Sequence, residues 1–312
     1  MSAGVGPAGS DGRAGKDLRL KLAVQKSGRL TEPSLDLLAR CGLKVSRGKD
    51  QLVGYGENMP LDLLFVRDDD IPDLVQEDVC DLGLVGLNVL EEKRLELAAR
   101  GHPPRFQRVR SLDFGRCRLA LAVPEGAVFS GLRSLHGKRI ATTYPYLLEQ
   151  HLRAHDVSAE IVVLSGAVEI APRLGRADAI CDLVSTGSTL QANHLREVET
   201  LLESHAVLIR TPLDLPLEKD GWVERLLMRI DGVQQVRESK YIMLHAPRAA
   251  LAEIRQLLPG CETPTIIPLE GHPDRVAVHA VCRENVFWET LEELKRAGAS
   301  ALLVLPVEKM LD

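Results

Sequence analysis

The sequence has few aromatic residues, no excess of positive charge and no long apolar run. Aromatic residues make up 4% of the 312-residue chain, so a base-stacking platform for single-stranded nucleic acid is not expected. Lys and Arg number 39 against 44 Asp and Glu, a net charge of −5, which offers no general attraction for DNA or anionic membranes. No apolar run approaches the roughly 18 residues of a membrane span. We therefore expect no nucleic-acid partner and no membrane association.

Paired cysteines are missing as well. The six cysteines are scattered and none forms a Cys-x-x-Cys motif, which argues against a zinc ribbon or a disulfide framework. Residues 1–17 are rich in Gly, Ala and Ser but lack the apolar core of a secretory signal. We expect reduced core thiols, a disordered N-terminal extension over residues 1–17, and a cytoplasmic location.

Three common catalytic motifs are also absent. The sequence contains no H-E-x-x-H zinc motif, no G-x-S-x-G nucleophile elbow and no Walker A loop. Gly83 and Gly86 lack the third glycine of a dinucleotide fingerprint. These absences leave zinc proteases, common hydrolases and P-loop nucleotidases without support.

What is present is an alternation of apolar strands and amphipathic helices, which predicts an α/β fold with helices on both faces of a parallel or mixed sheet. We expect a first lobe over residues 18–110, completed by about 200–228, a second lobe over 111–199, and a cleft between them. The expected strands are 18–24, 61–66, 80–85, 117–123, 139–142, 160–164, 178–183 and 206–211, and the expected helices are 31–41, 71–77, 88–99, 145–155, 167–174 and 190–195.

Residues 229–312 have a different order. A strand at 240–246, a helix at 247–258, strands at 263–269 and 275–282, a helix at 285–297 and a strand at 301–307 are expected. This β-α-β-β-α-β order is typical of a ferredoxin-like domain. Such domains often sense small molecules, although a fold alone does not establish a function.

The strongest local signal is the segment ADAICDLVSTGST at 177–189. An apolar strand carrying Asp178 and Asp182 breaks into Ser, Thr and Gly ahead of a helix. Backbone amides and hydroxyls converge there, as in a phosphate-binding loop, and Gly187 allows close approach. A carboxylate just upstream suits the hydroxyls of a sugar. A simple helix N-cap remains the alternative.

Four further segments place polar residues at the ends of strands, where α/β folds bind ligands. Lys26 and Arg29 follow the first strand, with solvated turn charges as the alternative. Acidic residues follow Arg67 in the sequence RDDD; they suit Mg²⁺ or a helix N-terminus. In ATTYPY, Tyr144 or Tyr146 could line a base or ribose pocket, with a buried tyrosine as the alternative. In GAVEIAP, Glu169 is a site candidate, because a carboxylate is costly to bury without a partner.

Taken in order, these segments resemble one family. The sequences QKSGRL, ENMPLDLLFVRDDDIPDLV, KRIATTYP, GAVEIAPRLGRADAICDLVSTGSTL, ESKYIMLHAP, PTIIPL and LVLPVEKM are similar to those of the long-form ATP phosphoribosyltransferases of histidine biosynthesis. The resemblance runs from about Leu18 to Leu311. It implies a two-lobed body like that of periplasmic binding proteins and a C-terminal ferredoxin-like (ACT-like) regulatory domain over 229–312.

The resemblance also implies an activity. Such an enzyme, a pentosyltransferase that requires Mg²⁺, transfers the phosphoribosyl group of 5-phosphoribosyl-1-pyrophosphate to N1 of ATP and releases pyrophosphate. L-Histidine would inhibit it by feedback at the C-terminal domain, and the enzyme would be a homo-oligomer that shifts between dimer and hexamer. Two other functions stay open at this point: a non-catalytic two-lobed binding protein, and a histidine sensor attached to an inactive body.

Carried over to this chain, the resemblance assigns site residues. Leu87 departs from the polar residue that the family often has there. The residues implied to bind the phosphoribosyl group are Glu169, Asp182, Leu183, Val184, Ser185, Thr186, Gly187, Ser188 and Thr189, with Asp182 also implied as a metal ligand. Lys26, Arg29, Arg67, Asp69 and Tyr144 would contact ATP or the other anionic substrate, and His245, Cys261, Thr263 and Thr265 would form the regulatory histidine site.

Overall fold

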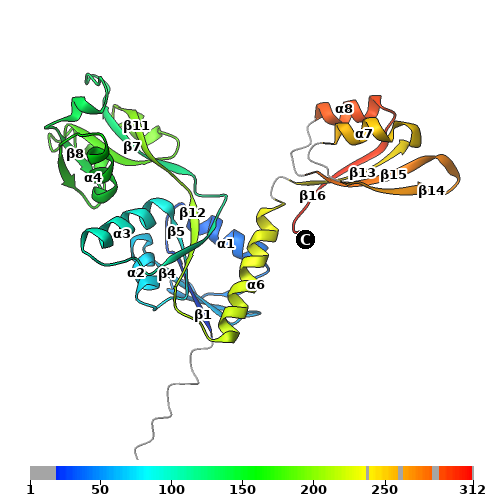
Figure 1. Cartoon of the computed structure of the whole chain (residues 1–312), viewed down its shortest axis with the longest axis horizontal. Coiled ribbons are helices and arrows are strands. Elements are labelled where there is room, and N and C mark those ends of the chain that lie inside the picture. The colour runs from blue at the N-terminus through cyan, green and yellow to red at the C-terminus, as the bar shows by residue number, and fades with distance from the viewer. Residues whose placement is uncertain (1–18, 237–238, 259–262, 283–287, 311–312) are drawn as a thin grey trace, which may run out of the picture. The chain divides into compact units, whose positions relative to one another are not determined.

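The chain divides into two compact units, which are described separately. In this computed structural model the described residues are 19–236, 239–258, 263–282 and 288–310 (Figure 1). The first unit holds the residues up to Ala39 and Leu43–Val223, and the second holds Arg40–Gly42 and the residues from Glu224 onward. The extension expected over residues 1–17 lies outside the described residues.

The first lobe of the first unit, lobe I, is built on a seven-stranded sheet. Its strands, in sheet order, are β2 (Val45–Ser46), β3 (Val53–Gly56), β4 (Leu61–Val66), β1 (Leu20–Gln25), β5 (Leu82–Gly86), β12 (Ala206–Arg210) and β6 (Gln107–Ser111). The central strands β4, β1 and β5 are parallel. β1 and β5 are almost wholly buried, as their continuous apolar sequences predict for a sheet covered on both faces. β12 pairs antiparallel with β5, so the expected return of this strand to the first sheet is confirmed.

Lobe I also contains four helical segments, in the connections between its strands. They are α1 (Thr31–Arg40), the 3₁₀ turn η1 (Asp68–Asp70), α2 (Ile71–Gln76) and α3 (Leu87–Ala99). Pro72 lies in the first turn of α2, where its missing amide costs nothing. Thr31 begins α1, and its hydroxyl donates to the carbonyl of Gln25.

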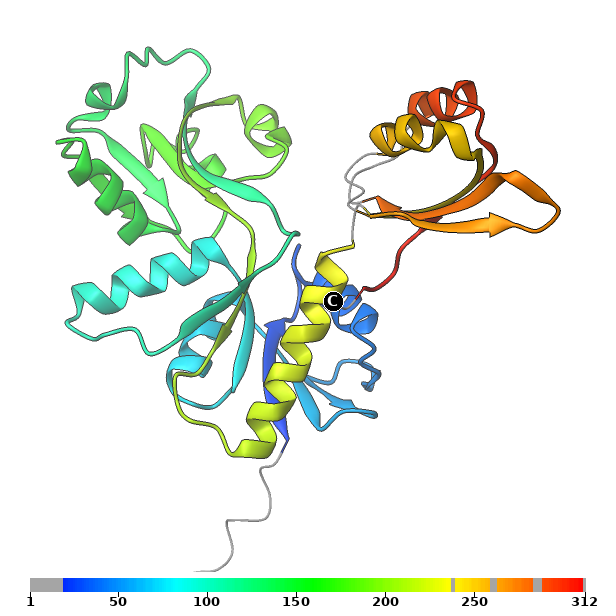
Figure 2. The same ribbon diagram turned by 45° about the vertical axis from the view of Figure 1, so that its right-hand side comes forward.

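The second lobe, lobe II, has a five-stranded sheet. Its order is β11 (Leu195–Ser204), β7 (Cys117–Pro124), β10 (Ala179–Val184), β8 (Arg139–Thr142) and β9 (Glu160–Val163), and its helical segments are η2 (Leu132–Leu135), α4 (Pro145–Ala154), η3 (Val168–Ile170) and α5 (Ser188–Ala192). β8, β9 and β10 are parallel, and β7 is antiparallel to β10 and β11. The chain enters this lobe after β6 and leaves it after β11 (Figure 2).

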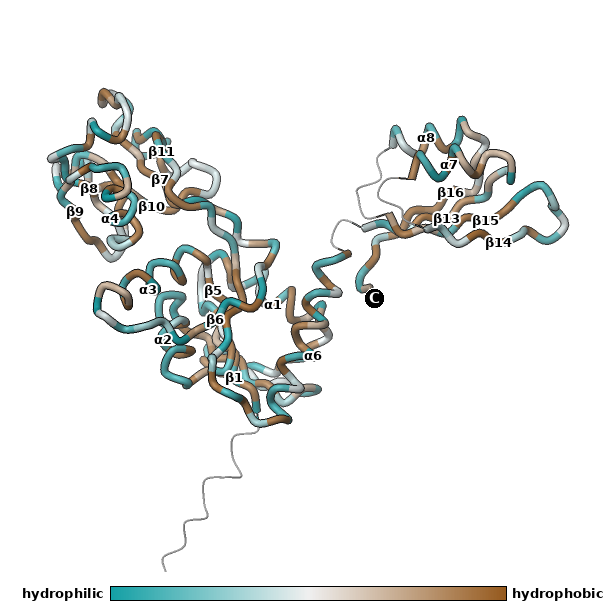
Figure 3. The backbone as a smooth tube through the Cα atoms, viewed as in Figure 1, coloured by the Kyte–Doolittle hydropathy of each residue, from teal (hydrophilic) through white to brown (hydrophobic). Residues whose placement is uncertain are grey.

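The second unit contains a four-stranded antiparallel sheet. Its strands, in sheet order, are β14 (Thr265–Leu269), β15 (His272–Cys282), β13 (Lys240–Pro247) and β16 (Ser300–Pro306), and its helical segments are η4 (Arg248–Ala250), α7 (Leu251–Leu257) and α8 (Trp288–Arg296). Ile242, Leu244, Val276 and Val278 alternate along β13 and β15 and form its core with residues of both helices. Apolar residues concentrate in the strands of this sheet and of the two other sheets (Figure 3).

The fold corrects two predicted helices of lobe II. The helix expected at 167–174 is only the short 3₁₀ turn η3, because Ala167 is left-handed at φ 49° and Pro172 has no amide to donate. The helix expected at 190–195 is α5, which ends at Ala192. Leu195 instead begins β11, a ten-residue strand that was not predicted.

Other elements were missed altogether. These are β2, β3, β6 and the 18-residue helix α6 (Leu217–Gln234). The sequence of α6 contains Gly221 and Gly232, which lower helix propensity. Val223, Leu226 and Ile230 are nevertheless buried, and burial of one face supplies the stability that propensity lacks.

Candidate active site

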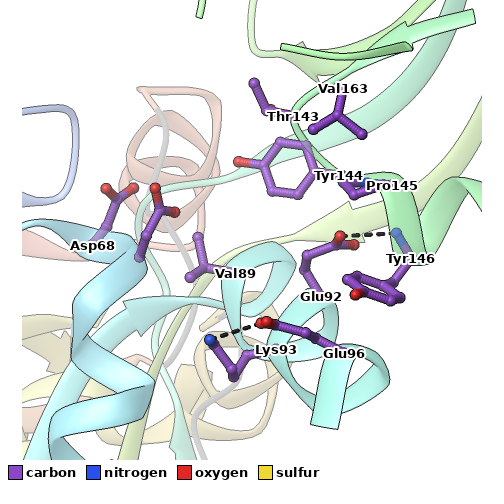
Figure 4. Close-up of a pocket in the computed structure, with 11 residues that line it drawn as sticks. Asp68, Val89, Glu92, Lys93, Glu96, Thr143, Tyr144, Pro145, Tyr146 and Val163 are labelled. Carbon is purple, nitrogen blue, oxygen red and sulfur yellow. Dashed lines mark hydrogen bonds and ion pairs between the residues drawn. The ribbon is translucent and has the colours of Figure 1, made fainter. Parts of the chain in front are cut away.

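Lobes I and II line a pocket of about 390 Å³ (Figure 4). Lobe I contributes acidic residues of η1 and one side of α3, and lobe II contributes the segment between β8 and α4. The lining residues are Asp68, Asp69, Val89, Glu92, Lys93, Glu96, Thr143, Tyr144, Pro145, Tyr146 and Val163. Two of the predicted site residues, Asp69 and Tyr144, are among them.

A buried hydrogen-bond network fixes Tyr144. The Asn88 side-chain amide donates to the Tyr144 hydroxyl at 2.9 Å, and the Ser204 hydroxyl donates to Asn88 Oδ1 at 2.8 Å. The backbone amide of Tyr144 also donates to Thr142 Oγ1 at 2.9 Å. Burial raises the pKa of the Tyr144 phenol well above its usual range, and the nearby carboxylates of Asp68, Asp69 and Asp182 raise it further, although the bond to Asn88 opposes them. Tyr144 is therefore a fixed, neutral hydroxyl at the pocket.

The carboxylate of Glu92 joins the two lobes. One of its oxygens accepts a hydrogen bond from the backbone amide of Tyr146 at 2.8 Å (Figure 4). The other accepts from the backbone amide of Leu147, also at 2.8 Å. These amides lie in the first turn of α4, where a negative charge also interacts favourably with the helix dipole. Burial raises the pKa of Glu92, and the two amide bonds partly offset this rise.

Charged residues on α3 complete the lobe I side of the pocket. Lys93 Nζ lies 2.9 Å from Asp73 Oδ2 and 2.7 Å from Glu96 Oε2. Loss of surrounding water at the pocket and the repulsion of Asp68 and Asp70 raise the pKa of Asp69. The pocket lining thus contains one basic residue, Lys93, and four acidic ones. Such a lining suits a ligand that includes a positively charged group, such as a phosphate with a bound metal ion.

The segment Ser185–Thr189 joins β10 to α5. Gly187 adopts φ 83° at the N-cap of α5, a conformation in which a residue with a Cβ is strained. The hydroxyls of Thr186 and Ser188 lie 3.0 Å apart, and the Ser188 amide faces Thr186 Oγ1 at 3.4 Å. Except for Gly187, which is half-buried, these residues are exposed, so their hydroxyls are accessible to an anion.

Asp182 lies at the head of this segment. It is half-buried, and its Oδ1 accepts a hydrogen bond from the Leu183 amide at 2.8 Å. Burial raises the pKa of Asp182, the charge of Glu169 raises it further, and the Arg29 guanidinium lowers it. These three residues, from β1–α1, η3 and β10, therefore lie within electrostatic range of one another.

The predicted residues thus form two linked groups. Glu169, Asp182 and Arg29 interact electrostatically, and Asp182 also acts on Tyr144, which lines the pocket. Lys26 and Arg67 are exposed beyond the ends of β1 and β4, and the Arg67 charge acts on Asp69. Leu183 is half-buried and Val184 is buried within β10, so their side chains are turned towards the protein.

Sequence reasoning missed Asn88, Ser204 and Glu92. Asn88 is the one polar residue within the run LVGLNVL, and a lone polar residue in an apolar run was a usable signal. Glu92 lies in a charged helix and gave no such signal, because its partners are backbone amides of another lobe. Leu87, the departure from the family pattern, is buried in the core of the first unit, so it offers no polar contact.

The residues predicted for a regulatory site lie in the second unit. His245 on β13 is half-buried, and Thr265, the first residue of β14, is exposed. By strand register, both belong to the sheet face opposite the core residues Leu244 and Val278. Thr263 is exposed just before β14. Cys261 lies outside the described residues.

Two other expectations are tested by the structure. The described cysteines are buried and form no disulfide: Cys41, Cys80, Cys117, Cys181 and Cys282. This confirms, for them, the predicted core thiols. Within the described part of the chain, no helix combines the length and the hydropathy needed to cross a membrane.

Comparison with known proteins identifies two matching family models. The model for HisG, ATP phosphoribosyltransferase, matches residues 67–232, and the model for the HisG C-terminal domain matches residues 237–309. Among solved structures, the chain is similar to the ATP phosphoribosyl transferase (HisG:HisZ) complex from Thermotoga maritima, with 26% identity and a TM-score of 0.56 over 68% of this chain and 98% of that chain. It also matches the alkanesulfonate-binding protein SsuA from Xanthomonas axonopodis pv. citri, with 15% identity and a TM-score of 0.44 over 69% of this chain and 72% of that one.

Proposed function

The chain belongs to the ATP phosphoribosyltransferase family, and from this premise we propose that it transfers the phosphoribosyl group of 5-phosphoribosyl-1-pyrophosphate to N1 of ATP. The family assignment makes it an enzyme of histidine biosynthesis and a metal-dependent pentosyltransferase. The predicted fold class, a two-lobed α/β body with a separate C-terminal domain, is confirmed by the two sheets of the first unit, by the family match and by the similar solved structure. A purely non-catalytic binding protein does not agree with this assignment.

One observation carries the proposal for the site. The exposed hydroxyl segment Ser185–Thr189 follows Asp182, whose carboxylate interacts with Glu169 and Arg29. Amides and hydroxyls at 185–189 would bind the 5-phosphate of the phosphoribosyl group. Asp182 and Glu169 would accept hydrogen bonds from the ribose hydroxyls, and Arg29 would contact the negatively charged substrates.

The remaining residues would bind ATP. Tyr144 is held at the pocket by Asn88, and its fixed ring offers an apolar surface beside the adenine. Lys26, Arg67 and Asp69 lie at the strand ends of lobe I and would contact the triphosphate, directly or through its counterions. Binding both substrates against rigid strands brings N1 and C1 together, and this positioning is a major source of the rate increase.

The reaction needs little proton transfer. The lone pair of adenine N1 forms the new bond to C1 of the ribose, while the bond from C1 to the pyrophosphate oxygen breaks and its electron pair leaves with pyrophosphate. No general base is assigned, because N1 carries its lone pair at neutral pH. Positive charge develops on the sugar in the transition state, so the carboxylates of Asp182 and Glu169 are suited to stabilise it.

We propose that the metal is Mg²⁺. Two half-buried carboxylates, those of Asp182 and Glu169, lie within electrostatic range of each other, and burial together with the Glu169 charge raises the pKa of Asp182. A divalent cation near these carboxylates would offset both effects, and oxygen ligands are those that Mg²⁺ prefers. Asp182 would be the main protein ligand. When bound, the cation supplies positive charge for the departing pyrophosphate.

The C-terminal domain would bind L-histidine as a feedback inhibitor. The match at residues 237–309 and the separate four-stranded sheet support an independent binding module. His245, Thr263 and Thr265 would contribute to this site, together with Cys261. Inhibition requires that histidine bind one state of the enzyme better than another.

The enzyme would be a cytoplasmic homo-oligomer that shifts between dimer and hexamer. The open face of the four-stranded sheet supports an interface, because by register it includes Ile267, Leu303 and Leu305, which are 44–47% exposed. Apolar side chains grouped on a face are typical of protein–protein contacts. The described cysteines, which form no disulfide, support a reducing compartment.

A direct assay tests the activity. The full-length protein is mixed with ATP, 5-phosphoribosyl-1-pyrophosphate and Mg²⁺, with pyrophosphatase added to pull the equilibrium forward. The ultraviolet absorbance of N1-alkylated adenine should rise, and omitting any one component should abolish the rise. Failure to form the adduct would reject the proposal, and histidine binding without turnover would support a sensor attached to an inactive body.

Variants test the phosphate segment. The double variant Thr186→Ala with Thr189→Ala should raise KM for 5-phosphoribosyl-1-pyrophosphate more than KM for ATP, since only the former would bind there. Ser158→Ala is a matched control, because Ser158 is also an exposed hydroxyl of lobe II but precedes β9, at the other end of the parallel strands. Equal effects on both KM values would place the phosphate elsewhere.

A further inference from the structure

A group of metal-binding side chains lies in lobe II outside the pocket. His151 on α4 and His155 just after its C-terminal end lie four positions apart, and Glu199 lies on β11, which contacts α4. Residues four apart share one face of a helix. The two histidines form an H-x-x-x-H pair in the sequence, and the carboxylate that completes the group comes from β11, a strand that was not predicted.

The geometry of the group suits a single ion. One ligand atom from each of the three residues lies within 4.8 Å of the other two. The His151 Nε2 atom is buried without a hydrogen-bond partner, at 3.5 Å from Glu199 Oε1. A buried nitrogen that lacks a partner costs free energy, and a bound cation would remove that cost.

The orientation of His155 is also favourable. Its Nδ1 lies 2.9 Å from the His151 carbonyl oxygen, so Nδ1 carries the proton and donates it to that oxygen. The other ring nitrogen, Nε2, then keeps its lone pair for a ligand. Metal-binding histidines commonly make such a bond through the nitrogen that does not bind the metal.

The protonation state of His151 agrees with this arrangement. Burial lowers its pKa and the neighbouring His155 lowers it further, while Glu199 acts in the opposite direction. A neutral imidazole is the form that binds metals. His155 is exposed, which leaves room for water molecules to complete the coordination.

We propose that His151, His155 and Glu199 form a binding site for a divalent transition metal, with Zn²⁺ as the best match. Two imidazole nitrogens and one carboxylate are a common zinc ligand set. Mg²⁺ prefers oxygen ligands, so this site differs from the one that would serve the transfer reaction. None of the three residues lines the pocket. Binding would tie α4 to the edge strand β11 and stabilise lobe II.

Titration of the full-length protein with Zn²⁺ tests the proposal. An untagged protein, treated with a chelator and then dialysed, is titrated by calorimetry in the presence of excess Mg²⁺. We expect saturable binding of one ion and a higher thermal midpoint. Co²⁺ in place of Zn²⁺ should give visible absorption bands, whose intensity reports on ligand geometry.

His155→Ala and Glu199→Gln should each weaken Zn²⁺ binding by more than about tenfold, because each removes a direct ligand. His155 is exposed, so its replacement should leave the fold intact, which circular dichroism checks. His194→Ala is the matched control: His194 is an exposed histidine of lobe II that lies 3.7 Å from the carboxylate of Glu125, and it should bind Zn²⁺ as the natural chain does. Absent binding, or the same affinity in His155→Ala and Glu199→Gln as in the natural chain, would overturn the proposal.

Discussion

Asn88 shows how a single buried polar residue positions the pocket. It donates to the Tyr144 hydroxyl, accepts from the Ser204 hydroxyl, and its backbone amide donates to Ser204 Oγ at 3.1 Å. These residues come from α3, from the start of α4 and from β11, so the network links both lobes. A buried network of this kind is favourable only while each member keeps its partners.

Asn88→Ala should therefore lower the free energy of unfolding by about 1–3 kcal/mol, because the buried Tyr144 hydroxyl loses its donor and the Ser204 hydroxyl loses its acceptor. Urea denaturation followed by circular dichroism measures the change. Asn193→Ala is a control, since the half-buried Asn193 side chain donates to the carbonyl of Thr189, four residues before it in the chain, and links no distant segments. A cost for Asn88→Ala no larger than that of the control would show that the network contributes little.

His205 should make stability depend on pH. Burial lowers the pKa of its imidazole, and the charges of Arg108 and Arg116 lower it further. The unfolded chain, with a pKa near 6.5, takes up the proton first. Stability is thus retained above pH 6.5 and falls as the pH drops from there towards the folded-state pKa.

His205→Gln should flatten this part of the stability profile. Urea midpoints measured between neutral and mildly acidic pH provide the comparison with the natural chain. His102→Gln is the control, because His102 is an exposed histidine of lobe I. If the slope against pH were the same in all three proteins, His205 would not be its source.

At the scale of elements, an ion pair fixes the first turn of α6 to the sheet of lobe I. Lys219 Nζ lies 3.1 and 3.2 Å from the two oxygens of Asp81, which also accepts from the Lys21 amide. The side chains are only 8% and 12% exposed. Removing either side chain of this pair leaves the charge of its partner buried and uncompensated.

Lys219→Met should destabilise the protein by about 3–5 kcal/mol, and adding Asp81→Asn should recover part of the loss. Asp220→Asn serves as the control. Asp220 lies in the same first turn of α6 as Lys219 and pairs with Arg210 of β12 at 3.1 Å. Because its side chain is 44% exposed, the expected loss of stability is below about 1 kcal/mol. Denaturation midpoints of the four proteins test this. Equal costs for Lys219→Met and Asp220→Asn would contradict the argument.

For the whole molecule, the division into two units separates the proposed chemistry from the proposed regulation. The pocket and the phosphate segment lie in the first unit, and the four-stranded sheet belongs to the second. Each unit has a core of its own. Such a division allows a sensor to be removed while the catalytic residues are kept.

Deletion of residues 233–312 should abolish inhibition by L-histidine while leaving the transfer reaction measurable, because the residues proposed for catalysis all precede the cut. Activity is assayed with and without L-histidine, and circular dichroism verifies folding. The full-length variant His245→Ala, which should weaken inhibition alone, covers the case in which the truncated chain does not fold. Unchanged inhibition in a folded truncated protein would refute the regulatory assignment.

Most central strands of the first unit could be predicted from the sequence, because buried strands in the middle of a sheet have apolar runs that stand out from their surroundings. β1, β4, β5, β7, β8 and β10 are examples. The edge strands β2, β6 and β11 could not, because their exposed or half-buried residues include many polar ones. The helix α6 was missed because its stability comes from the burial of one face rather than from local propensity.

The sequence by itself determined the α/β alternation, the order of strands and helices in the C-terminal domain, and the hydroxyl segment after Asp182, since all of these depend on residues that are close in the chain. Only the tertiary structure decided that Asn88 fixes Tyr144, that Glu92 binds the first turn of α4, and that Glu199 joins His151 and His155. These contacts connect residues 44 to 116 positions apart. Hydrogen bonds and metal ligands act over a few ångströms in space, and sequence patterns do not report which distant segments meet.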